Sequence, residues 1–193
     1  FKMDLILLAI SAIFVNNILL AQCLGNCPFM GVSKKLSTSL GMGVAVIFVA
    51  TLASIFTWLV YYYILVPLEL KYIQTLIFIL IIASLVQFVE IFLKRFSKGL
   101  YNALGIYLPL ITTNCAVMGI ALLNIKHEFG FWEMVVFSIS SAAGFTLAIL
   151  LFASIRERLF ISHVPQFMRG SAIALVTAGI MSLSFMGFCG MVN

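Results

Sequence analysis

The chain has 193 residues, of which 64% are hydrophobic and 9% are charged, and its mean hydropathy is +1.22. A soluble domain carries roughly 25% charged residues because its surface faces water, so this composition excludes an ordinary soluble fold. The net charge of +5 does not indicate a nucleic-acid partner, because the cations are distributed as they are in the loops of membrane proteins.

Six apolar stretches follow one another along the chain, at residues 5–24, 40–63, 72–93, 100–123, 131–155 and 170–191. A helix needs about 20 residues to cross the ~30 Å hydrocarbon core of a bilayer, and each stretch is long enough. The loops between them are short. The sequence therefore predicts an all-α integral membrane protein, a single membrane domain of six transmembrane helices embedded in a lipid bilayer.

The basic residues are unequally divided between the two sides that this topology defines. Eight lie in the loops after the first, third and fifth spans, and three lie on the other side. Because loops rich in Lys and Arg stay in the cytoplasm, we expect both termini to lie outside it. The eight are Lys34, Lys35, Lys94, Arg95, Lys98, Arg156, Arg158 and Arg169, and the three are Lys2, Lys71 and Lys126.

An internal repeat is centred on two cysteines. Residues 26–32 read Asn-Cys-Pro-Phe-Met-Gly-Val, and residues 114–120 read Asn-Cys-Ala-Val-Met-Gly-Ile. Two spans follow each copy, which divides the chain into three-helix repeats at about 4–97 and about 98–193. An odd number of spans turns the second copy upside down, and inverted repeats place functional residues near the bilayer midplane on interrupted helices.

The depth of the cysteines supports this interpretation. Cys27 lies seven residues before Lys34 and Cys115 lies eleven before Lys126, which as helix correspond to ~11 Å and ~17 Å. Both values are close to half of the ~30 Å core. The preceding segments are too long for the other half, so we expect the first and fourth spans to be broken or re-entrant before the cysteines. Candidate positions for the breaks are Asn16, Asn17, Gly25 and Pro28 in the first span, and Gly105, Pro109 and Thr112 to Asn114 in the fourth.

Two thiols at this depth favour a soft metal centre. The start of a helix stabilises a thiolate, and thiolates in proteins bind zinc or iron–sulfur clusters. A cluster takes about four ligands, so Cys27 and Cys115 would need two more from a second polypeptide. Cys23 and Cys189 have no counterpart in the other repeat, and we interpret them as packing residues. The alternative is that all the cysteines are structural.

The motifs resemble those of the NqrDE/RnfAE family over essentially the whole chain. The resemblance is carried by Val15 to Asn17, Leu24 to Lys35, Leu108 to Val117, Ile155 to Arg158 and Met186 to Phe188. The motifs Cys-Pro-Phe-Met-Gly and Thr-Thr-Asn-Cys are most similar to those of A-type subunits of the Rnf branch. The relative most easily confused with these is the E-type subunit of the sodium-pumping NADH:quinone reductase.

The resemblance implies a subunit of an ion-translocating ferredoxin:NAD oxidoreductase in a bacterial or archaeal cell membrane, inactive alone and coupled to Na⁺ or H⁺ movement. It implies a homologous E-type partner of opposite topology, with which the chain shares a [2Fe–2S] cluster. Cys27 and Cys115 match the positions of this chain's two ligands. The remaining subunits, B, C, D and G, would hold the flavins and the other iron–sulfur clusters.

The sequence also suggests roles for three further polar residues and leaves two alternative functions open. Asn26 and Asn114 start the cysteine helices and are expected to support the ligands without binding metal. Glu90 lies four residues before Lys94, which favours an interfacial pair; the alternative is a place on a cation pathway. An inverted-repeat ion transporter or channel without its own redox centre, or a membrane scaffold for redox subunits, remains an alternative function.

Overall fold

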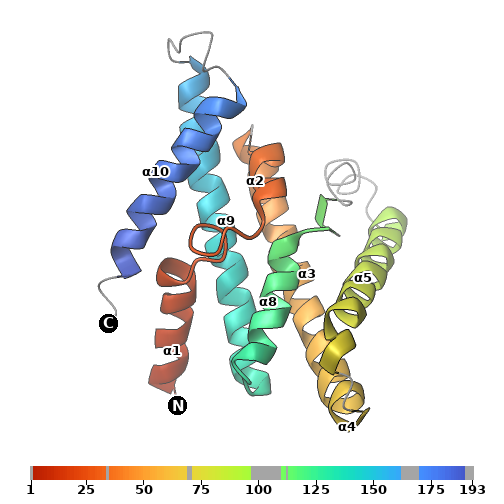
Figure 1. The fold of residues 1–193 in the computed structure, drawn as a ribbon. Helices are drawn as coiled ribbons and strands as arrows, with labels where there is room; N and C mark the ends of the chain where they lie inside the picture. Colours follow the sequence, from red (N-terminus) through yellow and green to blue (C-terminus); the bar gives the residue numbers. More distant parts are fainter. Residues whose placement is uncertain are drawn as a thin grey trace.

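The computed structural model describes residues 2–33, 35–68, 71–96, 110–111, 113–161 and 170–189, and all regular structure in these ranges is helical. In chain order the elements are α1 (Lys2–Ile10), η1 (Ser11–Val15), α2 (Asn26–Val32), α3 (Leu36–Val60), η2 (Tyr61–Leu65), α4 (Val66–Leu68), η3 (Lys71–Ile73), α5 (Gln74–Phe96), α8 (Cys115–Lys126), α9 (Phe131–Ile161) and α10 (Ser171–Cys189) (Figure 1). Both η1 and η2 are π-helical, and η3 is a 3₁₀ turn.

Three of the described helices are long and apolar enough to cross a membrane, at residues 36–65, 74–91 and 131–161. They correspond to the predicted spans 40–63, 72–93 and 131–155. Shorter apolar helices cover residues 5–15, 115–126 and 171–187. The prediction of an all-α membrane protein is therefore confirmed. In the described residues the apolar helices of the first and sixth predicted spans are shorter than a full crossing, and residues 100–109 of the fourth predicted span lie outside the described residues.

The predicted break ahead of Cys27 is present. The first helix ends at Val15, residues 16–25 follow an irregular path, and α2 begins at Asn26. The π-helical turn closes with the Asn16 N–H donating to the Ser11 carbonyl at 2.8 Å. Figure 1 shows this loop between α1 and α2 at mid-height of the molecule.

The helix that carries the second cysteine begins at that cysteine. Thr113 and Asn114 are not helical, and α8 starts at Cys115. The other residues expected to break this span, Gly105, Pro109 and Thr112, lie outside the described residues.

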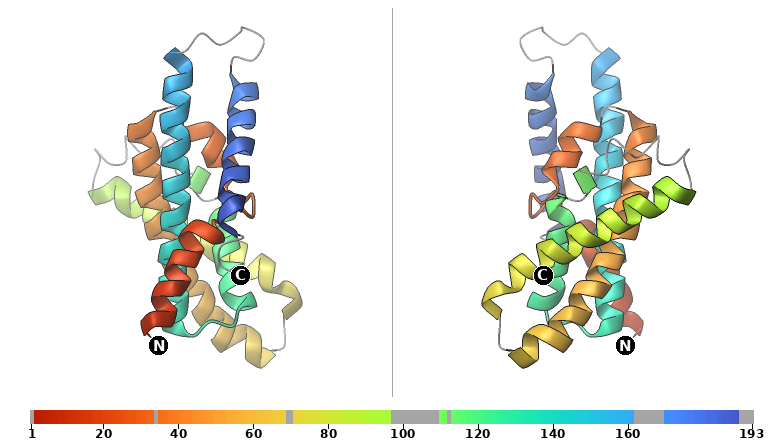
Figure 2. Two further views of the ribbon diagram at one scale, coloured as in Figure 1. Left: turned by 90° about the vertical axis from the view of Figure 1, so that its left-hand side faces the viewer. Right: turned by 90° about the vertical axis from the view of Figure 1, so that its right-hand side faces the viewer.

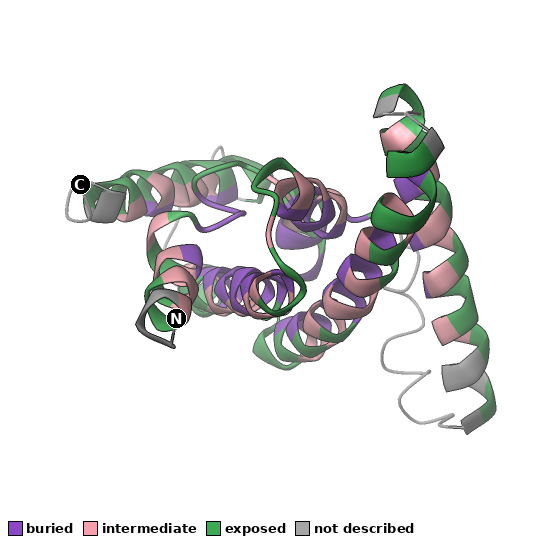
Figure 3. Cartoon of the chain, turned by 90° about the horizontal axis from the view of Figure 1, so that it is seen from below, coloured by how far each residue is buried: buried purple, intermediate pink, exposed green. Residues whose placement is uncertain are grey.

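The core of the molecule is the contact between α3 and α9. In the apolar stretch of α9, 61% of residues are buried, compared with 17% in that of α5, so α9 is central and α5 peripheral. Seen from below, α1 and α10 lie at one edge of the helix bundle and α5 at the other (Figure 3). The two side views show α1 and α5 on opposite sides of the molecule (Figure 2). Contacts between α3 and α9 are close because Gly43 faces Thr146: a Cβ at Gly43 would lie 2.9 Å from Thr146 Oγ1.

Replacing Gly43 with Ala is expected to lower the stability of the protein by about 1–3 kcal/mol, because the new methyl overlaps a β-branched side chain with little rotamer freedom. The measurement is the melting temperature of the purified protein in detergent. Gly179→Ala on α10 is the matched control, since a Cβ there would have nothing within 4 Å. Equal melting temperatures for the two variants would contradict the α3–α9 contact.

Candidate functional site

The two cysteine motifs, distant in sequence, meet in the structure. The backbone N–H of Gly25 donates a hydrogen bond to Cys115 Sγ at 2.9 Å. Gly25 is the residue before α2, the helix that carries Cys27, so the start of each cysteine helix touches the other. The hydrogen bond directs a backbone N–H dipole at the sulfur.

Only glycine fits at position 25. Its φ of +90° lies in the left-handed region, which costs other L-residues roughly 1–2 kcal/mol. A Cβ there would also lie 2.7 Å from Phe145 Cε2 and 3.1 Å from the Ala116 Cβ. The close approach that brings the Gly25 N–H to the sulfur therefore depends on the missing side chain.

Asn17 holds the irregular backbone ahead of α2 in place. Its buried amide donates to the carbonyls of Ile13 at 3.1 Å and Gly144 at 2.9 Å. The Asn17 side-chain oxygen accepts from the N–H groups of Leu19 at 3.1 Å and Leu20 at 3.4 Å. One side chain thus satisfies the N–H groups of Leu19 and Leu20 in an apolar interior and ties the irregular segment to α9.

Asn26 and Asn114 occupy matching positions in the sequence repeat but form different hydrogen bonds. Asn114 is the N-cap of α8, and its side-chain oxygen accepts from the Ala116 N–H at 3.0 Å, while its amide nitrogen has no hydrogen-bond partner. Asn26 is already the first residue of α2, and its amide donates to the Cys23 carbonyl at 3.2 Å. The two helices therefore begin one residue apart relative to the sequence repeat.

The thiols lie toward the surface of this chain. Cys27 and Cys23 are exposed and Cys115 is partly exposed. Cys23, interpreted from the sequence as a packing residue, stands in the irregular loop with φ +54° and is exposed in this chain. The side chain of Cys189 lies outside the described residues. In the part of the chain that the structure describes, no three His, Cys, Asp or Glu side chains are grouped as a metal site.

Arg156 fixes the far end of α2, a role that sequence reasoning missed. From α9, its guanidinium donates to the Met30 carbonyl at 3.0 Å and to Ser33 Oγ at 2.9 Å. It also lies 5.7 Å from the centroid of the Phe152 ring, which stacks on Phe29 of α2 at 4.0 Å. The short helix that carries Cys27 is thereby held from both ends. Arg156 lies in the motif at residues 155–158, but sequence spacing alone does not link that motif to α2.

Comparison with known proteins agrees with the motifs. The family described as "Rnf-Nqr subunit, membrane protein" matches residues 5–192. The chain belongs to the Rnf-Nqr family. The family resemblance drawn from the cysteine motifs is thereby confirmed.

Several Rnf-Nqr members are similar over almost their whole length. The A subunit of the Na⁺-translocating ferredoxin:NAD⁺ oxidoreductase complex of Acetobacterium woodii is 59% identical over 189 residues, which are 98% of each chain. The A subunit of the ion-translocating oxidoreductase complex of Pectobacterium atrosepticum is 56% identical over 187 residues, 97% of each chain. That of Yersinia enterocolitica is 56% identical over 190 residues, 98% of each chain.

Glu90 lies on α5, a different helix from the two that carry the cysteine motifs. It is partly buried in the last part of α5, which diverges from the other helices in Figure 1. The side chain of Lys94, its predicted partner, lies outside the described residues. A place for Glu90 on a cation pathway stays a prediction.

Gly25→Ala is expected to destabilise the protein by about 2–4 kcal/mol, since it adds left-handed strain to an overlap with Phe145 and displaces the N–H from Cys115. The melting temperature of the purified complex measures this. Gly31→Ala in the same motif is the control, because its Cβ would meet only Leu110 Cδ2 at an ordinary 3.8 Å. If both variants melt alike, the close approach at Gly25 is not required.

Arg156→Gln is expected to lower stability by about 1.5–3 kcal/mol, the range for hydrogen bonds to a charged donor. Arg156→Lys should recover part of the loss, because it keeps one donor but not the planar fork. Arg158→Gln on the exposed face of α9 is the control. Thermal unfolding of the three purified variants gives the comparison, and a loss of the same size in Arg158→Gln would argue against a specific hold on α2.

Proposed function

We propose that this chain is a membrane subunit of an ion-translocating electron-transport complex of the ferredoxin:NAD oxidoreductase type. In this proposal Cys27 and Cys115 supply two ligands to a [2Fe–2S] cluster shared with a homologous E-type subunit. The observation that carries it is the contact of the two cysteine motifs through the Gly25 N–H and Cys115 Sγ. The names of the relatives, each the A subunit of such a complex, support the assignment to a complex.

The residues present fit half of such a cluster. Cysteine thiolates are the usual ligands of iron–sulfur clusters, about four to each. This chain brings two cysteine motifs together, and both thiols reach its surface, as ligands shared with a second polypeptide must. A cluster completed within the described residues is not supported, since they hold no group of three suitable ligands.

A [2Fe–2S] cluster bound there would supply one-electron transfer, and the residues of this chain would set its surroundings. Hydrogen bonds to ligand sulfurs are one of the means by which proteins tune a cluster's potential, and the Gly25 N–H is placed to do this at Cys115. Asn114 caps the turn that holds Cys115. Phe145 and Ala116, both fully buried, pack against Gly25.

We further infer that the chain is built of two inverted repeats, about 4–97 and 98–193. Reciprocal packing supports this. Gly31 of the first motif faces Leu110, shortly before Cys115, and its counterpart Gly119 faces Leu24, shortly before Cys27. In Figure 1, α2 and α8 also leave the middle of the molecule toward opposite ends.

The proposed setting is a bacterial or archaeal cell membrane, with both termini outside the cytoplasm. The distribution of basic residues supports this orientation. The partners would be the E-type subunit of opposite topology and the B, C, D and G subunits. This chain alone would not be active, because it supplies only part of the path of the electron.

The ligand assignment predicts that Cys27→Ser or Cys115→Ser, each alone, removes the EPR signal of the reduced cluster and abolishes electron transfer by the purified complex. The reason is that loss of one thiolate leaves an iron under-coordinated where water enters only with difficulty. The isolated chain should bind little or no iron. Asn26→Ala and Asn114→Ala should be milder and shift the potential of the cluster without emptying the site.

Cys23→Ser is the matched control, since Cys23 is exposed in the same loop but has no counterpart in the second motif. Its EPR signal should match the wild type. A full signal in Cys115→Ser would show that the ligands are misassigned. In that case an ion transporter component without a redox centre becomes the better interpretation.

A further inference from the structure

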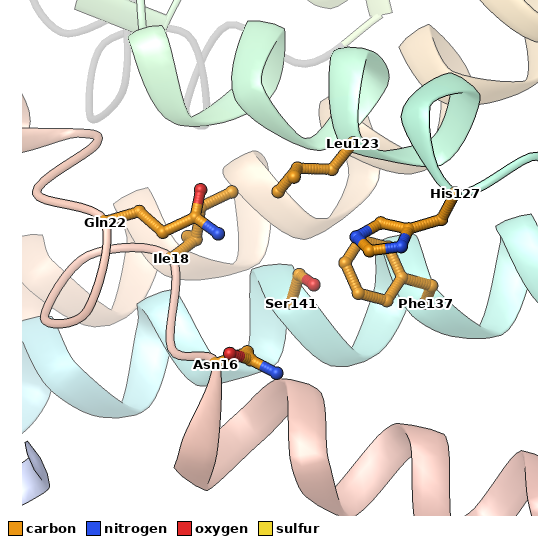
Figure 4. A pocket seen from close by; sticks show the side chains of 7 residues that line it. All are labelled: Asn16, Ile18, Gln22, Leu123, His127, Phe137 and Ser141. Carbon is orange, nitrogen blue, oxygen red and sulfur yellow. The ribbon is translucent and has the colours of Figure 1, made fainter. Parts of the chain in front are cut away.

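A small cavity with a partly polar lining lies beside the broken first helix, and no cysteine is among the residues that line it. Its volume is about 130 Å³, enough for several water-sized groups. Its polar lining comes from Asn16 and Gln22 in the irregular loop, His127 at the end of α8, and Ser141 on α9 (Figure 4). None of the side chains that line it is a carboxylate, a lysine or an arginine.

Ser141 has no partner in a place where hydroxyls normally have one. It is 1% exposed, and its Oγ forms no hydrogen bond. Other α9 hydroxyls donate to the carbonyl four residues earlier, at 2.7–2.9 Å, as seen at Ser138, Thr146 and Ser154. An unpaired buried hydroxyl is unfavourable, so the Ser141 oxygen beside the cavity indicates a group that is bound there.

Two helices also end at this cavity. The first helix stops at Val15, directly before Asn16, and α8 stops at Lys126, directly before His127. The carbonyl end of a helix carries a partial negative charge. In transporters built on broken helices, such ends and unwound carbonyls are where Na⁺ is coordinated. The field of both ends favours a cation over an anion.

The chemistry of the lining selects the class of cation. Amide and hydroxyl oxygens are hard, neutral ligands, which suit a small hard ion rather than a soft metal. Divalent Ca²⁺ and Mg²⁺ normally require carboxylates in addition, and none lines this cavity. The remaining candidate is a monovalent ion that keeps part of its water.

We propose that this cavity binds a small monovalent cation of the Na⁺ class. The protein ligands are Ser141 Oγ and the side-chain oxygens of Asn16 and Gln22, with water completing the shell. The proposal rests on the proposed function and extends it by giving this chain its own cation site. It places that site between α8, α9 and the broken helix, and not at Glu90.

The test uses the whole complex, purified and reconstituted in lipid nanodiscs, with ²²Na⁺ binding and the Na⁺ dependence of electron transfer as readouts. Ser141→Ala should raise the half-saturating Na⁺ concentration about tenfold in both, because it removes one ligand. Gln22→Glu, at an exposed position, should lower it by a similar factor because it adds a negative charge. Ser154→Ala is the control, since that exposed hydroxyl on the same helix already has its partner. Li⁺ should compete with ²²Na⁺ and K⁺ should compete poorly.

The EPR signal of the cluster is recorded for every variant, which separates this inference from the proposed function. No ²²Na⁺ binding to a wild-type complex with a normal EPR signal would overturn the cation site and leave the cluster proposal standing. An unchanged half-saturating Na⁺ concentration in both Ser141→Ala and Gln22→Glu would also overturn the cation site. If Ser141→Ala fails to assemble, tighter binding in Gln22→Glu supports the site and unchanged binding overturns it.

Discussion

The structure depends on satisfying a stretch of non-helical backbone inside an apolar protein. Residues 16–25 lie between two helices in a chain whose composition places it in lipid, where each unpaired N–H or carbonyl costs several kcal/mol. The Asn17 side chain accepts hydrogen bonds from two of these groups, the N–H groups of Leu19 and Leu20, and Ser182 of α10 donates to the Leu20 carbonyl at 2.9 Å. With those partners the chain can turn at mid-depth and present Gly25 to Cys115.

This arrangement separates two kinds of helix end. The cysteines stand at the beginnings of α2 and α8, whereas the cavity stands at the ends of η1 and α8. A chain that breaks its helices creates both kinds of end in the interior. Beginnings favour negative groups such as thiolates, and ends favour positive groups such as cations. In the two proposals the thiolates lie at helix beginnings and the cation lies at helix ends, and no carboxylate lines the cation cavity.

The sequence predicted the features that depend on composition averaged over many residues. The span over 131–155, which is observed as a helix over 131–161, and the break before Cys27 followed from hydropathy and from the length of chain available to cross the core. The inequivalence of Asn26 and Asn114 could not be predicted, because it depends on a one-residue difference in backbone conformation. The exposure of Cys23 depends on a left-handed residue, which no pattern marked. The contact of Arg156 with α2 joins residues more than 120 positions apart, which the periodicity of a sequence does not relate.

The partners of the irregular segment have one thing in common: they come late in the chain. Asn17 relies on Gly144, α2 on Arg156, Leu20 on Ser182, and Gly25 on Cys115. A nascent chain leaving the ribosome has therefore made this loop long before the residues that stabilise it exist. The first three helices cannot reach their final arrangement until α9 and α10 have entered the membrane. During insertion, the polar backbone groups of the early loop must therefore stay hydrated or be covered by other factors. Truncation near the C-terminus should destabilise the part of the protein that is made first.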